Sequence, residues 1–208
     1  MDSTLKSLLE QGKNQTQDFT ISLDNFVEIA QILSSFANSD GGSLFVGLKS
    51  NGKITGINPE EEKQKLHEIC TDFCKPALKF ETRVWQEGFR LLLEVKIAPD
   101  SNRNITAKDE NGNWKIFIRS KEFTLQANKI LGKIWNLEKK ESQKLSQLQD
   151  KEQTFLNLFT KDIKTTLSQL YDKSSLEKSE VDDLLSQMVF SKFVEMEMTD
   201  KGTFYCLI

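Results

Sequence analysis

Cysteine and histidine are scarce in this chain of 208 residues. Its three cysteines, Cys70, Cys74 and Cys206, are too few and too widely spaced for a disulfide framework, and Cys70 and Cys74 lack the second ligand pair of a zinc site. The only histidine, His67, argues against a multi-histidine metal centre and a histidine-dependent hydrolase. Residues 1–15 contain no apolar stretch that could act as a signal peptide or cross a membrane. We therefore predict a cytoplasmic protein with reduced thiols, no resident metal and no membrane partner.

The composition is that of an ordinary folded protein, with 38% apolar and 28% charged residues. The length suits two modest domains. The net charge is −3, but residues 102–140 carry nine Lys/Arg against four Asp/Glu. This middle segment is where a phosphate-binding surface would be sought, although such a charge excess also suits a solvated face. Its candidate basic residues are Arg103, Lys108, Lys115, Arg119, Lys121, Lys129 and Lys133.

Apolar residues recur at helical spacing from Ser22 to Ala37, with Ser22 or Asp24 as the expected cap. The sequence "NSDGG" should end this helix, and "SLFVGL" then reads as a buried strand. Asn51-Gly52 predicts a hairpin turn with "KITGI" as its returning strand. A second helix is expected from Pro59 up to Pro76.

Further strands are predicted for "LKFETRVWQ", "FRLLLEVKIA" and "NWKIFIRS", with turns at Glu87-Gly88 and Asn111-Gly112. This order gives an α+β domain whose mixed sheet is built from hairpins with flanking helices. Residues 125–149 read as one helix, the second half of which has few apolar anchors.

The last part of the chain reads as a separate unit. It contains three helical segments, "KEQTFLNLFTK", "TTLSQLYDKS" and "SEVDDLLSQMVF", with a Thr cap on the second and a capping box of Ser179 and Asp182 on the third. The alternating segments "FVEMEM" and "TFYCLI" then form a hairpin. Three helices followed by a hairpin is the winged-helix order. We therefore expect domains at 1–135 and 151–208, with a helical connector at 136–150.

The stretch "SFANSDGGSLFVGLKSNGKITGI", together with "IFIRSKEFTLQAN", resembles the signature of the Schlafen AlbA-like domain family. The matching positions are Phe36, Ala37, Asn38, Gly41, Gly42, Gly47, Gly52, Gly56 and Arg119. The resemblance covers about residues 10–135, and it implies a regulator that binds nucleic acid or a nucleotide such as ATP.

The same resemblance makes cleavage chemistry doubtful. Family members that cleave RNA use three carboxylates, and of these the chain keeps Asp18 but has Lys13 five residues earlier and Lys49-Ser50 after the glycine strand. Thr20 stands where the family commonly has lysine. Metal-assisted cleavage needs clustered carboxylates, and a P-loop needs a Lys and a following helix that "NSDGGSLFVG" lacks. We predict no catalytic residues and no required cofactor, with ATP as an alternative ligand.

The predicted ligand or nucleic-acid site comprises Asn38, Gly41, Gly42, Arg103, Lys108, Lys115, Arg119 and Lys121. Some of these residues have a structural alternative: the glycines could form a helix-ending turn, and Arg119 could pair with a carboxylate at the edge of the core. Trp114 could stack on a base or pack in the core. The acids Glu180, Asp182 and Asp183 at the start of the third tail helix oppose DNA binding there. The leading hypothesis is a non-catalytic protein that binds DNA or RNA through its basic middle segment, and the rival is a homodimer or protein-interaction module.

Overall fold

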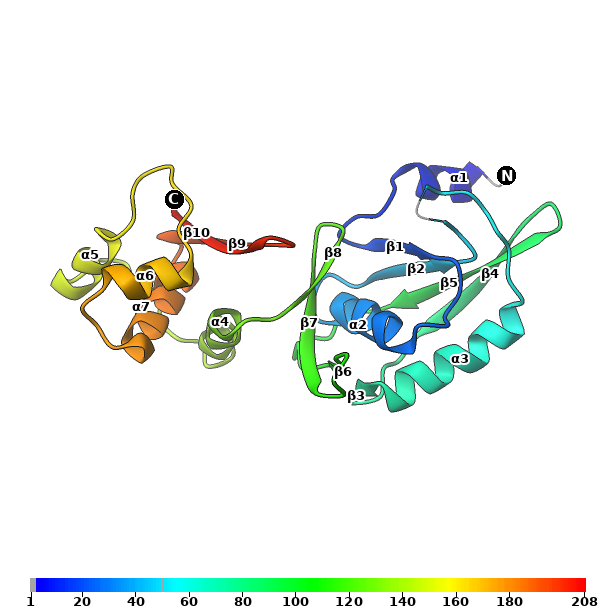
Figure 1. Ribbon diagram of the computed structural model, residues 1–208, viewed down its shortest axis with the longest axis horizontal. Coiled ribbons are helices and arrows are strands. Elements are labelled where there is room, and N and C mark those ends of the chain that lie inside the picture. Colours follow the sequence, from blue (N-terminus) through cyan, green and yellow to red (C-terminus); the bar gives the residue numbers. More distant parts are fainter. Residues whose placement is uncertain (1–2, 50) are drawn as a thin grey trace. The chain divides into compact units, whose positions relative to one another are not determined.

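The computed structural model describes residues 3–49 and 51–208. The chain forms two compact units, divided between Gln126 and Ala127 (Figure 1). Both units combine helices with strands, so the predicted α+β class is confirmed. Each unit has its own apolar core and is described by itself.

A four-stranded mixed sheet forms one layer of the first unit. Its order is β1 (Gln17–Thr20), β2 (Gly42–Val46), β5 (Arg90–Ile97) and β4 (Glu81–Glu87). β1 pairs parallel to β2, while β5 is antiparallel to both β2 and β4. The sequence did not indicate β1, because a four-residue strand that buries Gln17 and Asp18 shows no apolar alternation.

A second, antiparallel sheet has the order β3, β6, β7 and β8. These strands are β3 (Cys74–Lys75), β6 (Thr106–Lys108), β7 (Trp114–Ser120) and β8 (Phe123–Gln126). β7 matches the predicted strand "NWKIFIRS". The other three strands have two to four residues, which is too short to give a periodic signal.

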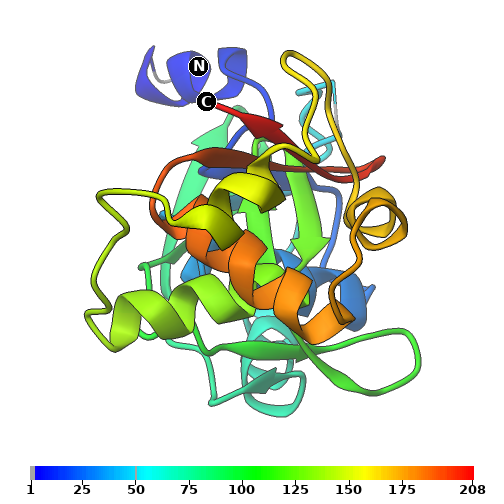
Figure 2. The ribbon, with the colours of Figure 1, turned by 90° about the vertical axis from the view of Figure 1, so that its left-hand side faces the viewer.

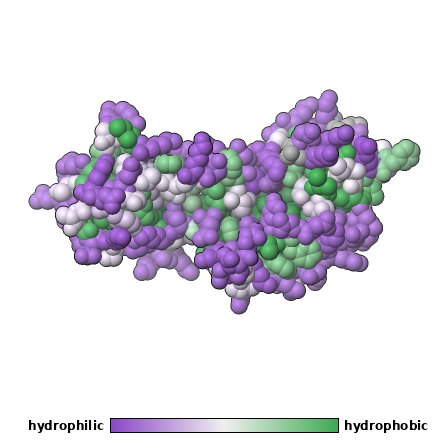
Figure 3. All heavy atoms as spheres, in the orientation of Figure 1, coloured by the Kyte–Doolittle hydropathy of each residue, from purple (hydrophilic) through white to green (hydrophobic). Residues whose placement is uncertain are grey.

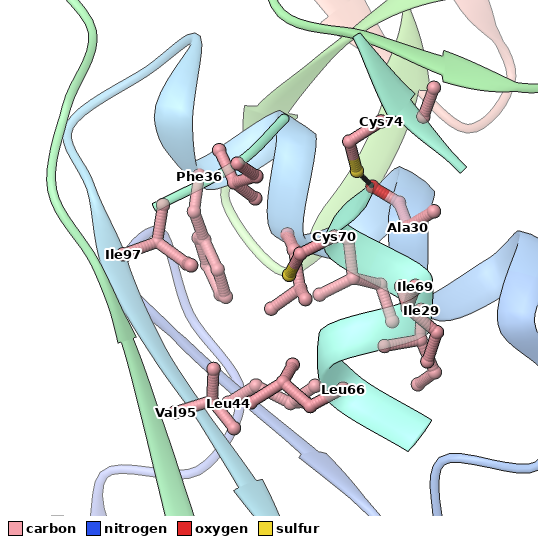
Figure 4. Packing of buried hydrophobic residues seen from close by; sticks show 14 of the residues in the cluster. Ile29, Ala30, Phe36, Leu44, Leu66, Ile69, Cys70, Cys74, Val95 and Ile97 are labelled. Carbon is pink, nitrogen blue, oxygen red and sulfur yellow. Dashed lines mark hydrogen bonds between the residues drawn. The ribbon is translucent and has the colours of Figure 1, made fainter. Parts of the chain in front are cut away.

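Helix α2 (Phe26–Ala37) contacts both sheets, and α3 (Pro59–Asp72) packs beside it (Figure 1). Asn25, rather than Ser22 or Asp24, caps α2, because its side chain accepts a hydrogen bond from the Glu28 amide. Figure 4 shows the core between these layers, where Phe36, Leu44, Leu66 and Val95 come from four different elements. Cys70 and Cys74 lie within it as apolar packing groups.

The opposite face of the first sheet has a smaller core beneath α1 (Ser3–Glu10). Leu5 packs there with Phe19, Phe45, Trp85 and Leu92.

The segment "KITGI" is not a strand, and its prediction is wrong. The turn at Asn51-Gly52 forms, but only one bridge follows it, between Leu48 and Ile54. Gly52 and Gly56 both have positive φ, so the chain bends away after three residues.

The second unit contains α4 (Lys129–Lys139), α5 (Asp150–Leu156), α6 (Leu167–Lys173), α7 (Lys178–Phe190), β9 (Val194–Thr199) and β10 (Gly202–Leu207). The predicted order of three helices and a hairpin is present as α5 to β10. Thr166 caps α6 as expected, whereas the capping box of α7 is formed by Glu177 and Glu180 and not by Ser179 and Asp182. Figure 2 shows α4 lying beside α7, the pair that makes most of the helix contacts in this unit.

One continuous helix over residues 125–149 does not form. Asn128 caps α4, which ends at Lys139, and the chain is irregular until α5 begins at Asp150. The expected first domain ended at residue 135, whereas Ile130 and Ile134 are buried in the core of the second unit. Leu145 and Leu148 pack against the same core, so the irregular stretch also belongs to that unit.

Candidate functional site

The Gly41-Gly42 turn closes α2 and starts β2. Gly41 has φ 76°, and its amide donates to the Phe36 carbonyl at 2.9 Å. A Cβ atom on Gly41 would lie 2.9 Å from the Ile97 oxygen, and one on Gly42 would lie 2.6 Å from the Phe36 ring. The glycines are therefore required by close packing of the helix end on the strands.

Asn38 joins the end of α2 to the second sheet. Its side-chain nitrogen donates to the carbonyls of Ile105 at 2.7 Å and Phe117 at 2.9 Å, and its oxygen accepts from the Ile105 amide. The residue is buried, with every polar side-chain atom engaged. Asn38 thus holds two layers together and does not face solvent.

Arg119 is buried on β7 and forms an ion pair with Asp18 of β1 at 2.8 Å. The same guanidinium donates to the carbonyls of Asn14 and Gln17 and to the Thr124 hydroxyl. The guanidinium carbon lies over the Phe36 ring, 5.1 Å from its centroid. Of the two roles predicted for Arg119, the structure shows pairing with a carboxylate.

Asp18 has a second cationic partner, Lys13, at 2.6 Å, and it also accepts a hydrogen bond from the Phe19 amide. The lysine that stands at an expected carboxylate position therefore neutralises the remaining carboxylate. Among residues 3–49 and 51–208, no group of three or more His, Cys, Asp or Glu side chains could hold a metal ion. Ser50, the other departure noted in the sequence, lies outside the described residues.

Three predicted basic residues belong to three different segments. Arg103 is exposed in the loop between β5 and β6, and Lys121 is exposed at the turn between β7 and β8, where its amide donates to Gln15. Lys115 pairs with buried Ala107, so it lies on the α2 side of the second sheet. There it is one of the groups, after the hydrogen bonds from Asn113, that hold the pKa of Asp109 below its ordinary value.

Lys108 belongs to a cluster on the opposite side of that sheet, which we call the outer face: Lys75, Thr106, Lys108, Trp114 and Ile116. In an antiparallel pair, residues opposite each other lie on one side, and β6 pairs Thr106 with Lys75 and Ile116, and Lys108 with Trp114. The ammonium groups of Lys75 and Lys108 lie 5.9 and 5.4 Å from the Trp114 ring centroid. Trp114 is 41% exposed, so it is not a core residue.

The outer face contains one predicted site residue, Lys108, and the site prediction omitted its other four residues, among them Trp114 and Lys75. Trp114 could have been placed there from the sequence, since the turn at Asn111-Gly112 fixes its register against Lys108. Lys75 could not, because the pairing of β3 with β6 is non-local and β3 has only two residues. The predicted site residues thus do not form one site.

The acids at the start of α7 are already paired within the second unit. Lys151 pairs with Glu180 at 2.9 Å, Lys129 with Asp182 at 2.8 Å, and Lys133 with Asp183. Asp182 is buried and also accepts a hydrogen bond from the Tyr171 hydroxyl at 2.5 Å. Two lysines of the basic segment, Lys129 and Lys133, are therefore engaged with α7.

Comparison with protein families identifies the first unit. The family model "Schlafen, AlbA_2" matches residues 9–128, which is more than half of the chain. The chain belongs to this family. The matched residues of the Schlafen AlbA_2 domain include the glycine turn, the Asp18–Arg119 ion pair and the outer face.

Two solved structures are similar to this Schlafen AlbA_2 protein at low identity. One is the N-terminal domain of an ATP-dependent DNA helicase RecG-related protein from Nitrosomonas europaea, with 20% identity, a TM-score of 0.40, and coverage of 53% of this chain and 80% of that one. The other is the DIP2311 protein from Corynebacterium diphtheriae, with 14% identity, a TM-score of 0.44, and coverage of 75% of this chain and 38% of that one. The comparison with curated proteins found no match.

The described part of the Schlafen AlbA_2 chain was also searched for membrane segments. None of its helices combines the length with the apolar character needed to cross a bilayer.

Proposed function

We propose that this protein binds single-stranded nucleic acid on the outer face of its second sheet, without cleaving it. The observation that carries the proposal is the exposed Trp114 ring with an ammonium group on each of two neighbouring strands, Lys75 and Lys108. An aromatic platform flanked by cations is the usual arrangement for holding a base and its phosphates.

The geometry favours an unpaired strand over a duplex. A base can stack on Trp114 only when its face is free, and the outer face is made of strand residues and not of a helix that could enter a major groove. The contacts of both lysines with the Trp114 ring are longer than 5 Å, and neither lysine has an ion-pair partner among the described residues, so both ammonium groups can turn to phosphate. Lys75 is exposed, whereas Lys108 is half-buried and also lies over the Phe73 ring, 4.5 Å from its centroid. Base stacking of this kind contributes about 1–3 kcal/mol per base.

Binding without cleavage is supported by the surroundings of Asp18. This carboxylate is buried and already neutralised by Lys13 and Arg119, so a metal ion would have to displace two cations. The alternative ligand, ATP, gains no support from the glycine turn, where the amides of Gly41 and Ser43 donate to backbone carbonyls. The winged-helix assignment of the second unit and the cytoplasmic location stay predictions.

Fluorescence anisotropy with a labelled single-stranded oligonucleotide tests the proposal. Trp114→Ala should weaken binding by about tenfold, which corresponds to the lower part of the stacking range. Phe89→Ala is the matched control, because Phe89 is a fully exposed aromatic residue of the same unit in the turn between β4 and β5, away from the outer face. Equal losses in both variants, or no binding by the unmodified chain at low salt, would contradict the proposal.

A second candidate, homodimerisation, is favoured by the exposed edge strand β4. β4 ends the first sheet, so the backbone of one edge has no partner strand among the described residues, and Val84 on this strand is exposed. Figure 3 shows apolar atoms where the β4–β5 turn protrudes, and Phe89 lies in that turn. A seven-residue edge strand is a ready template for pairing with the same strand of a second copy.

Sedimentation velocity tests this second candidate. A dimer of the full chain should become a monomer in Val84→Lys, because a lysine opposes edge-to-edge pairing. Ile163→Lys, which charges an exposed apolar residue of the second unit, should leave the dimer unchanged. A full chain that sediments as a monomer would exclude the homodimer.

A further inference from the structure

A cavity in the second unit has no part in the proposed function. Its volume is about 400 Å³, within the range of small-molecule sites. One wall is α5 with the residues that follow it, and the other is the end of α6 with the turn leading to α7. The lining residues are Asp150, Lys151, Thr154, Phe155, Leu158, Lys173, Ser174, Ser175 and Leu176.

The floor of the cavity is apolar. Phe155 is buried there and meets Phe159 edge to face, with the ring centroids 5.9 Å apart. Leu158 and Leu176 are only partly buried and belong to the same core. An apolar group placed in the cavity would extend this core and remove the remaining apolar surface from water.

The rim supplies positive charge. In the described part of the chain Lys173 has no carboxylate partner, and its contact with the Leu158 carbonyl is long, at 3.5 Å. Lys151 pairs with Glu180, but both side chains are about half exposed, so the pair is weak and can exchange. Ser174 accepts a hydrogen bond from the Leu176 amide and keeps its hydroxyl hydrogen for donation.

Asp150 limits the negative charge that a ligand at the rim can carry. The lining residues Asp150, Lys151 and Lys173 sum to +1, but Glu180 neutralises Lys151 from outside the lining, so Lys173 is the rim cation without a carboxylate partner among the described residues. A single carboxylate fits this balance, whereas a phosphate dianion would be repelled by Asp150. We propose that the cavity binds a small monocarboxylic acid with an aromatic or branched apolar group, with the carboxylate on Lys173 and the apolar group on Phe155.

The proposal is tested on the full chain, ¹⁵N-labelled, with 3-phenylpropionate as the probe and its uncharged amide as the matched ligand. The acid should shift the amide signals of residues 154–158 and 173–176. The amide should bind about tenfold more weakly, since it cannot pair with an ammonium group. Lys173→Gln should weaken binding of the acid by about tenfold, and Lys161→Gln, an exposed lysine outside the cavity, should not change it.

Three outcomes would overturn the proposal. One is the absence of shifts at about 10 mM acid, roughly ten times the Kd expected for so small a ligand. Another is equal affinity for the acid and the amide, which would mean that the rim charges play no role. The third is unchanged affinity in Lys173→Gln while its spectrum remains that of the folded chain.

Discussion

Arg119 and Asp18 connect strands of different sheets across the interior of the first unit. Their side chains are almost completely enclosed, and they lie 101 residues apart in the sequence. Removing one partner of such a pair leaves a buried charge without compensation, which costs more than the pair itself contributes. The ion pair is therefore a requirement of the fold, although the sequence alone allowed Arg119 a role in phosphate binding.

Arg119→Ala should lower the free energy of unfolding of the first unit by about 3–5 kcal/mol. The reason is that Asp18 would keep only Lys13, and the carbonyls of Asn14 and Gln17 would lose their donor. Urea unfolding, followed by amide signals of the first unit, measures this. Lys79→Ala, at an exposed position, should stay within about 0.5 kcal/mol, and a similarly small change for Arg119→Ala would refute the structural role.

Gly42→Ala should also destabilise the first unit, by about 1–3 kcal/mol, because the added methyl group would overlap the Phe36 ring and the Thr16 oxygen. Gly132→Ala provides the control. Gly132 lies in α4 with no atom within 4 Å of the added carbon, so alanine should stabilise the second unit by up to about 1 kcal/mol. Urea midpoints of the two units give both values, and a neutral Gly42→Ala would show that the turn has room to adjust.

At the scale of elements, α4 and α7 are joined by Lys129, Asp182 and Tyr171. The hydrogen bonds to Asp182 and then Tyr171 raise the pKa of Lys129, and burial, followed by the bond to Asp182, raises the pKa of Tyr171. Both groups are therefore held in their protonated forms by the folded state. Their contribution is fully present below about pH 10, the ordinary value for tyrosine, and is lost as the pH rises through the raised values.

The second unit should therefore lose stability as the pH rises above about 10, the ordinary pKa of tyrosine. The loss should be smaller in the double variant Lys129→Gln/Tyr171→Phe, which has no groups left to titrate at this contact. Lys164 and Tyr205, whose pKa values are also raised, remain in both proteins, so the difference isolates the α4–α7 contact. Urea midpoints at a series of pH values measure it, and parallel curves for the two proteins would count against the explanation.

The elements that depend on residues close together in the sequence could be predicted from it. The apolar spacing of α2, the glycine turn and the Asn111-Gly112 hairpin are each determined by a few neighbouring residues. β1 and β3 could not be predicted, because they are held by pairing with distant strands. The prediction of one long helix over residues 125–149 was wrong for a related reason. Asn128 caps α4, and Leu145 and Leu148 pack against the core of the second unit, which helical propensity does not reveal.

The difference between local and distant causes also applies to the candidate site. The sequence shows that residues 102–140 are rich in Lys and Arg, but the structure places these charges in different surroundings. Arg119 is buried, Lys115 lies on the α2 side of its sheet, and Lys129 and Lys133 pair with α7. A charge count along the chain cannot separate these cases, because they depend on which side of a strand or helix each residue occupies.

For the whole molecule, the structure separates two surfaces with different chemistry. The outer face of the first unit combines an aromatic ring with cations, whereas the cavity of the second unit combines an apolar floor with Lys173 at its rim. The two proposals depend on different residues, so either can fail without the other. The binding of nucleic acid by the outer face is the central one.

The salt dependence of single-strand binding tests that claim most directly. Each phosphate contact contributes about −0.7 to the slope of log K against log salt concentration. Lys75→Gln/Lys108→Gln should therefore make the slope less negative by about 1.4, whereas Lys53→Gln/Lys79→Gln, with the same net charge at two other exposed positions, should leave it unchanged. Equal slopes for the two double variants would contradict binding at the outer face.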